Sequence, residues 1–184
     1  RSVSISQMEM SAVIKKILEI ENIDYNYQIN DCTLLSCACE YNQIDIVEKL
    51  LKYKDIDVNT GKNGISPLMY AIKNKNIEMT KLLIQTGRIN INQRNYGGFT
   101  ALTVAAGNSL EEIIDLIINH ETFDPKESNL DYAFFFSDYQ ISKKLISVKG
   151  LDVNCVMIYE YSYNDLKGNW PSRATIISPR ISTQ

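Results

Sequence analysis

The chain alternates short apolar runs with polar patches. Residues 64–92, GISPLMYAIKNKNIEMTKLLIQTGRININ, contain two such runs, and a polar patch from Lys73 to Asn76 divides them. Runs of this length predict two short helices, each apolar along one face. Because neither helix is long enough to bury that face alone, we expect the pair to pack against further pairs of the same kind.

Four stretches of the chain share this pattern, and their starts are 33, 34 and 28 residues apart. Each begins with a hydroxyl residue that can cap a helix, continues through a short helix and a polar turn, and ends in a second helix. The four starting residues are Thr33, Ser66, Thr100 and Ser128.

Two positions agree in all four stretches, which indicates an internal repeat. An alanine stands five residues after each start, at Ala38, Ala71, Ala105 and Ala133. An apolar pair stands seventeen residues after each start, at Leu50-Leu51, Leu83-Ile84, Ile117-Ile118 and Leu145-Ile146.

The repeat extends upstream of the first start. Residues 12–18 are arranged like residues 45–51, and residues 23–26 mirror residues 56–59. These similarities predict the second helix of a further repeat, whose first helix is truncated or disguised.

Two of the helix starts carry a family motif. Ser66 to Ala71 read SPLMYA and Thr100 to Ala105 read TALTVA, which resemble the T-P-L-H-x-A motif of ankyrin repeats. The period near 33 residues and closing pairs such as Val58-Asn59 also match that family, over residues 11–154. The resemblance implies an all-α ankyrin-repeat solenoid of stacked helix-turn-helix units with short β-hairpin or turn connections.

The repeat frame divides the chain into segments. The last of them lacks the repeat signature, so a C-terminal cap, a disordered tail and a cloning-derived sequence all remain open for it. The expected segments are a partial N-terminal repeat or cap (1–27), three ankyrin repeats (28–60, 61–93 and 94–125), a shortened repeat (126–154) and the final segment (155–184).

The chain departs from the family pattern at two positions of each repeat. The motif histidine ties neighbouring loops in the family; Ser36 and Thr103 can replace it in part, whereas Met69 cannot. Lys75 takes a left-handed position that glycine holds in the family, at some energetic cost. We therefore expect an irregular stack of marginal stability. The histidine positions hold Ser36, Met69, Thr103 and Asp131, and the glycine positions hold Asn42, Lys75, Ser109 and Ser137.

Composition narrows the class of protein. The chain has 184 residues, of which 45% are hydrophobic and 22% charged, so it can bury a core. A net charge of −3 argues against nucleic acid or an anionic membrane as the partner. No apolar run approaches the roughly 20 residues that span a bilayer. Because Arg1 stands in place of Met, we expect a fragment. No signal-peptide pattern follows it, so we expect the cytoplasm, with the nucleus as an alternative. We also expect a monomer.

Four cysteines raise the question of a disulfide or a metal site. Cys32, Cys37 and Cys39 give a C-x4-C-x-C spacing, to which His120 or Cys155 could add a zinc ligand. Structural zinc sites use closer pairs, and Cys39 takes the place of a small core residue in the repeat. We therefore expect cysteines packed in the core and a reducing compartment, with no disulfide framework, metal or cofactor.

Candidate catalytic groups are few. His120, the only histidine, falls just after a second helix and has no nucleophile motif beside it. Glu111, Glu112 and Asp115 cluster, but they open a predicted helix, where negative charge stabilises the positive end of the helix dipole. We therefore expect no enzymatic activity.

The resemblance implies a partner-binding surface. In ankyrin proteins the turn tips and the ends of the first helices line a concave face that meets partner proteins. Tyr41, Tyr96 and Phe99 suit hot-spot anchors there, whereas Phe135 and Phe136 suit the sealing of the shortened repeat. The predicted partner-binding residues are Tyr41, Lys62, Asn63, Ile65, Lys73, Asn74, Tyr96, Phe99 and Asn108.

Together these features predict a non-enzymatic adaptor or scaffold module that binds another protein. An alternative is the regulatory or substrate-docking arm of a larger enzyme, such as a ubiquitin-ligase adaptor or a kinase. A third hypothesis is a membrane-cytoskeleton or effector scaffold, which would need more repeats than the chain contains.

Overall fold

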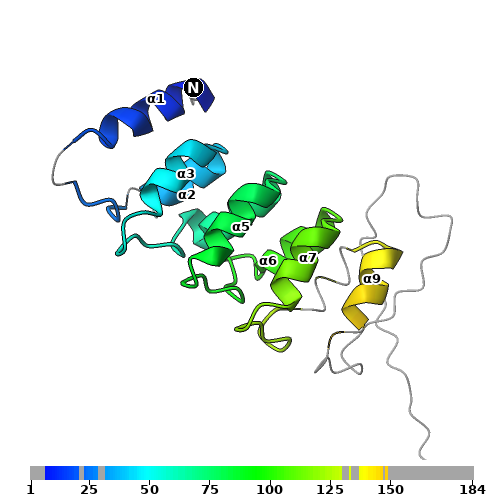
Figure 1. Cartoon of the computed structure of the whole chain (residues 1–184). Helices are drawn as coiled ribbons and strands as arrows, with labels where there is room; N and C mark the ends of the chain where they lie inside the picture. Colours follow the sequence, from blue (N-terminus) through cyan, green and yellow to red (C-terminus); the bar gives the residue numbers. More distant parts are fainter. Residues whose placement is uncertain are drawn as a thin grey trace, which may run out of the picture.

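The fold is a stack of short helices. The computed structural model describes residues 7–20, 23–28, 32–129, 133, 137–146 and 148. The helices follow one another along the stack in chain order, from α1 at one end to α9 at the other (Figure 1). They are α1 (Gln7–Ile17), α2 (Leu34–Glu40), α3 (Ile44–Leu50), the 3-10 turn η1 (Lys62–Gly64), α4 (Pro67–Lys73), α5 (Ile77–Gln85), α6 (Ala101–Gly107), α7 (Glu111–Ile118) and α9 (Tyr139–Ile146).

The helices form two rows. The first helices of the pairs make an inner row, in which α4 packs between α2 and α6. The second helices α3, α5 and α7 make an outer row, which α1 precedes and α9 follows (Figure 1). The described residues contain no β-strand, so turns connect the repeats. The predicted all-α solenoid is confirmed.

A hydroxyl residue caps each described inner helix, as predicted. Its side-chain oxygen accepts a hydrogen bond from the backbone N–H three residues later, at 3.1 Å for Thr33, 3.3 Å for Ser66 and 3.3 Å for Thr100. The fourth predicted cap, Ser128, precedes residues outside the described part. Its hydroxyl donates to the Pro125 carbonyl at 2.9 Å.

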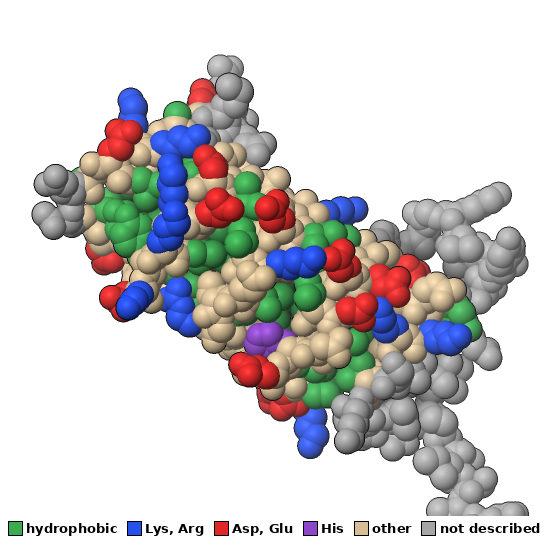
Figure 2. All heavy atoms as spheres, viewed as in Figure 1, with side chains coloured by type: hydrophobic (Ala, Val, Ile, Leu, Met, Phe, Trp, Pro, Cys, Tyr) green, Lys and Arg blue, Asp and Glu red, His purple; other side chains and the backbone are tan. Residues whose placement is uncertain are grey.

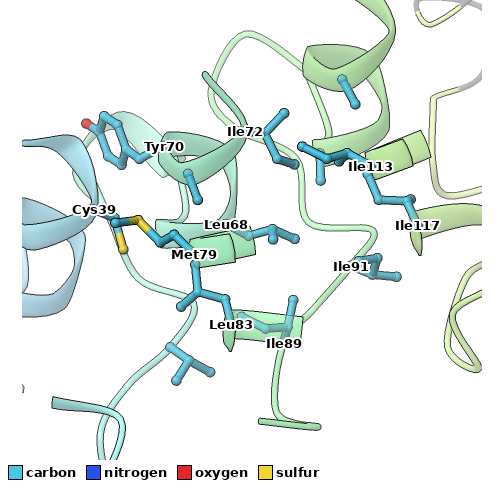
Figure 3. Close-up of a cluster of buried hydrophobic side chains, with 14 of the residues drawn as sticks. Cys39, Leu68, Tyr70, Ile72, Met79, Leu83, Ile89, Ile91, Ile113 and Ile117 are labelled. Atoms are coloured by element: carbon cyan, nitrogen blue, oxygen red, sulfur yellow. The ribbon is translucent and has the colours of Figure 1, made fainter. Parts of the chain in front are cut away.

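The repeated alanines and apolar pairs lie in the core. All four alanines are 0% exposed, and a methyl group is small enough for neighbouring inner helices to pack closely there. The first residue of each apolar pair is equally buried, on the outer row. Figure 3 shows part of this core, from Cys39 on α2 to Ile117 on α7. The buried set is Ala38, Ala71, Ala105 and Ala133 with Leu50, Leu83, Ile117 and Leu145.

The turns between paired helices use left-handed backbone. The φ angles of Asn42, Lys75 and Ser109 are 55°, 56° and 53°. The left-handed conformation predicted for these positions is therefore confirmed, and no glycine is present to adopt it without strain. Each turn closes with a hydrogen bond that folds the second helix back on the first, such as Asn76 N–H to the Ala71 carbonyl at 3.0 Å.

Lys75→Gly is expected to raise the free energy of unfolding by about 0.5–1 kcal/mol. Left-handed backbone strains a residue that has a Cβ, and the exposed Lys75 side chain contributes little in return. Urea unfolding at neutral pH measures the gain. Asn42→Gly is the control, because asparagine tolerates this backbone and its Oδ1 also accepts from Asn76 at 2.8 Å. An equal or larger gain at Asn42 would contradict the explanation.

An asparagine at the end of each repeat ties it to the next. Asn26, Asn59 and Asn92 each donate from Nδ2 to a backbone carbonyl of the following repeat, at 2.8, 3.0 and 2.8 Å. Each also accepts at Oδ1 from a backbone N–H of that repeat, at 2.7, 2.8 and 3.1 Å. Asn26 thus makes the same link from the segment in which a partial upstream repeat is predicted, and the buried Ile14 on α1 joins the same core.

Asp57 orders the turn that leads into this link. Its Oδ1 accepts from the backbone N–H groups of Asn59 and Thr60 at 2.8 and 3.1 Å. Partial burial raises the pKa of Asp57, but hydrogen bonds from Thr60 and Asn59 outweigh it and hold the pKa below the ordinary 3.8. The carboxylate therefore stabilises the fold above the ordinary pKa, and this stabilisation is lost as pH falls through the lowered one.

Asp57→Asn is expected to remove this part of the acid sensitivity. Asparagine keeps the turn, because Asn90 makes the same contact in the next repeat, accepting from Asn92 N–H at 3.2 Å. Urea unfolding of both proteins at pH 7 and pH 3 measures the difference. The natural protein should lose up to about 1 kcal/mol more on acidification than the variant. An equal loss in both proteins would contradict the assignment.

The prediction of no disulfide is wrong for one pair of cysteines. Cys32 and Cys37 form a disulfide. Cys32 directly precedes the capping residue Thr33, and Cys37 follows it in the second turn of α2, so the two occupy positions that apolar residues bridge in a hydrophobic staple. Cys39 is free and buried, as predicted, and burial raises the pKa of its thiol.

Candidate protein-binding surface

The nine predicted partner-binding residues lie on the inner row and on the turns that lead into it. The turns between the repeats join one another directly. Tyr96 N–H donates to the Asn63 carbonyl at 3.1 Å, which ties the turn at Lys62–Gly64 to the next turn along the stack. Asn95 Oδ1 accepts from Gly97 N–H at 2.9 Å and holds that second turn closed.

Two glycines make room for the aromatic rings at these turns. A Cβ on Gly64 would lie 3.0 Å from Cδ1 of Tyr96, so the Tyr96 ring rests against the bare backbone there. A Cβ on Gly97 would lie 3.1 Å from two ring carbons of Phe99. Phe99 is half-buried as a result, whereas Tyr96 stays 77% exposed.

The ends of the inner helices contribute the other predicted residues. Lys73 is exposed at the end of α4. Asn74 donates from Nδ2 to the carbonyls of Cys39 and Glu40 at 2.8 and 3.2 Å, so it satisfies the end of α2. Asn108 donates from Nδ2 to the Val104 carbonyl of its own helix at 2.8 Å.

Tyr41 lies half-buried at the end of α2, near Tyr70, which is buried in the middle of α4. Burial raises the pKa of Tyr70, and the charges of Glu40 and Tyr41 raise it further. Tyr70 keeps its proton at neutral pH and remains a neutral part of the core beneath this surface.

The structure thus separates the nine residues by exposure. Lys62, Asn63, Lys73 and Tyr96 are exposed, and the other five are half-buried. Of those five, Ile65 packs on the core. Phe135 and Phe136 lie outside the described residues. We call the exposed set with Tyr41 and Phe99 the candidate face.

Comparison with known proteins places the chain in a family. The family described as ankyrin repeats (3 copies) matches residues 3–95 and again residues 35–129. The chain is an ankyrin-repeat protein. Ankyrin repeats generally act as protein–protein interaction modules and are typically non-catalytic. No curated protein matches the chain well enough to count as a relative.

A hydroxyl group ties two neighbouring repeats where ankyrin proteins use the motif histidine. Thr100 Oγ1 donates to the Ser128 carbonyl of the following repeat at 2.7 Å, whereas Thr33 Oγ1 donates at 3.3 Å to the Thr60 carbonyl at the end of its own repeat. The residues at the histidine positions complete the caps, since Ser36 and Thr103 accept from the backbone N–H of Thr33 and Thr100. These bonds stay within one repeat, so the tie predicted for Ser36 and Thr103 is made at this site by the capping residue Thr100 instead. Met69 contributes only its backbone N–H to the cap at Ser66.

The carboxylate cluster of this ankyrin stack pairs with lysines of neighbouring repeats. Lys81 on α5 contacts Glu112 at 2.6 Å, and Lys144 on α9 contacts Glu111 and Asp115 at 3.0 and 2.7 Å. Hydrogen bonding to Asp115 is the main cause that raises the pKa of Lys144. Sequence reasoning missed these pairs, although opposite charges about one repeat apart were a signal that could have found them.

His120 lies on the outer side of the ankyrin stack. Its Nδ1 is 3.0 Å from the Thr122 hydroxyl, and the side chain lines an open groove between α5 and α7 with Ile84 and Leu116 (Figure 2). Among the described residues, no three or more His, Cys, Asp or Glu side chains gather in a way that could hold a metal ion.

None of the helices that the structure describes has the length and apolar character needed to cross a bilayer.

Proposed function

We propose that the ankyrin stack binds a partner protein through the candidate face, as an adaptor or scaffold without catalytic activity of its own. The observation that carries this proposal is the exposure of the Tyr96 ring on a fixed backbone. Its ring is 77% exposed, yet the backbone that bears it is fixed by the hydrogen bond to Asn63 and by the Gly64 surface behind it. An exposed aromatic ring on fixed backbone is a typical hot-spot anchor.

Fixed geometry supports binding because little entropy is lost when the partner arrives. The asparagine links and the Thr100 hydroxyl bond hold neighbouring repeats together before any contact with a partner. Burying one tyrosine ring contributes about 1.5–3 kcal/mol. A few such contacts suffice for micromolar affinity.

Tyr96→Ala is expected to weaken partner binding at least tenfold. Affinity capture of proteins from a cell lysate with the full chain, followed by quantitative mass spectrometry, identifies the partner. Titration of that partner against the variant then measures the affinity.

Tyr139→Ala is the matched control, because Tyr139 is 76% exposed on α9 of the outer row. The control should retain the natural affinity. If Tyr96→Ala binds the same partners with unchanged affinity, the candidate face is wrong.

A further inference from the structure

Charge is unevenly distributed between the two rows of the stack. Residues 61–76 and 94–109, which form two turns and the inner helices α4 and α6, contain four basic and no acidic residues. The chain as a whole has a net charge of −3. These two segments are therefore positive in an otherwise acidic protein, which favours an oppositely charged ligand at that surface.

The lysines of this region project into solvent. Lys62, Lys73 and Lys75 are exposed. In the part of the chain that the structure describes, none of the three forms a salt bridge, because the paired lysines all lie on the outer helices. Their charges are available to a ligand.

Acidic side chains gather instead on the outer row. The view of that row shows Asp and Glu along its length, mixed with lysines that pair with them (Figure 2). The described inner helices carry one acidic residue, Glu40, at the end of α2. A ligand that approaches the candidate face therefore meets little negative charge.

An apolar anchor lies next to the positive charge. Tyr96 packs over Gly64 and hydrogen bonds to the Asn63 backbone, and Lys62 immediately precedes Asn63. Phe99 lies half-buried in the same turn. A ligand bound here can place an apolar side chain on the Tyr96 ring and a carboxylate on Lys62.

We propose that the candidate face binds an acidic peptide segment of its partner, with an aromatic or large aliphatic side chain among the carboxylates. This inference rests on the proposed function and names the partner's chemistry. Helix α4, which separates Lys62 from Lys73, has seven residues and is about 10 Å long. An extended segment rises about 3.3 Å per residue, so a peptide of several residues reaches both lysines.

Selection from a random-peptide library displayed on phage tests the proposal even while the natural partner is unidentified. The full chain is the bait. Selected peptides should be enriched in Asp and Glu and should carry an aromatic residue or leucine. Their affinity, measured by fluorescence anisotropy, should fall at least tenfold when salt is raised from about 0.05 to 0.3 M, because exposed charges are screened.

Charge reversal provides the matched comparison. Lys62→Glu with Lys73→Glu should weaken the selected peptide at least tenfold. Lys49→Glu with Lys52→Glu makes the same charge change at exposed positions at the end of α3 and should leave the affinity within about twofold. Circular dichroism establishes that both double variants are folded.

Several results would overturn the proposal. These are selection of basic or uncharged peptides, no selection at all, equal affinity of the two double variants, or a single-stranded oligonucleotide that binds as tightly as the peptide. If Tyr96→Ala weakens binding of the natural partner but the Lys62 and Lys73 reversal does not, the proposed function stands and the acidic ligand is wrong. If neither Tyr96→Ala nor the Lys62 and Lys73 reversal weakens binding, the proposed function and the acidic ligand are both wrong.

Discussion

Ala71→Glu is expected to unfold most of the stack and to cost more than about 4 kcal/mol. Ala71 is 0% exposed on α4, the inner helix that packs between α2 and α6. Glutamate is too large for this position and would bury an unpaired charge. Because every repeat is stabilised by its interfaces with its neighbours, damage to the central one weakens those on both sides.

Far-UV circular dichroism and hydrogen exchange measure this outcome. The variant should lose most of its helical signal and its amide protection in α2, α4, α6 and their paired helices. Lys73→Glu is the control, because it introduces the same side chain at an exposed position of the same helix and should stay folded. Loss of protection confined to the repeat that contains Ala71 would contradict the shared-interface explanation.

Thr100→Val is expected to cost about 2–4 kcal/mol and to loosen the stack after α6. The Thr100 hydroxyl accepts from Thr103 N–H at 3.3 Å and donates to the Ser128 carbonyl at 2.7 Å, in a buried position. Valine has nearly the same shape but removes both the helix cap and the hydrogen bond to the Ser128 carbonyl. Urea unfolding measures the cost, and hydrogen exchange over residues 125–129 measures the loosening.

Ser66→Ala separates the cap from the tie between repeats. Ser66 caps α4 through Met69 N–H, and its described hydrogen bond stays within its own repeat. Its replacement should cost only about 1 kcal/mol, the usual value for a lost cap. Equal costs for Ser66→Ala and Thr100→Val would mean that the bond to Ser128 contributes nothing.

The candidate face was only partly predictable. The repeat frame placed Lys62, Lys73 and Tyr96 away from the core, and they are exposed. The same frame could not distinguish Asn74, whose amide is already bonded to the end of α2. Whether a polar side chain on an inner helix is available to a partner depends on what the preceding repeat presents to it, and spacing along the chain does not give that.

The sequence alone determined the repeat and everything local to it. It determined the period, the helix caps, the left-handed turns and the burial of Ala38 and its equivalents. These features depend on residues within a few positions of each other, because backbone preference and apolar spacing decide them. The tertiary structure decided the links between repeats. The Asn59 bond to Arg88 and the Lys144 pair with Asp115 each join residues 29 positions apart. They form because the offset between stacked helices brings those particular groups within hydrogen-bonding distance.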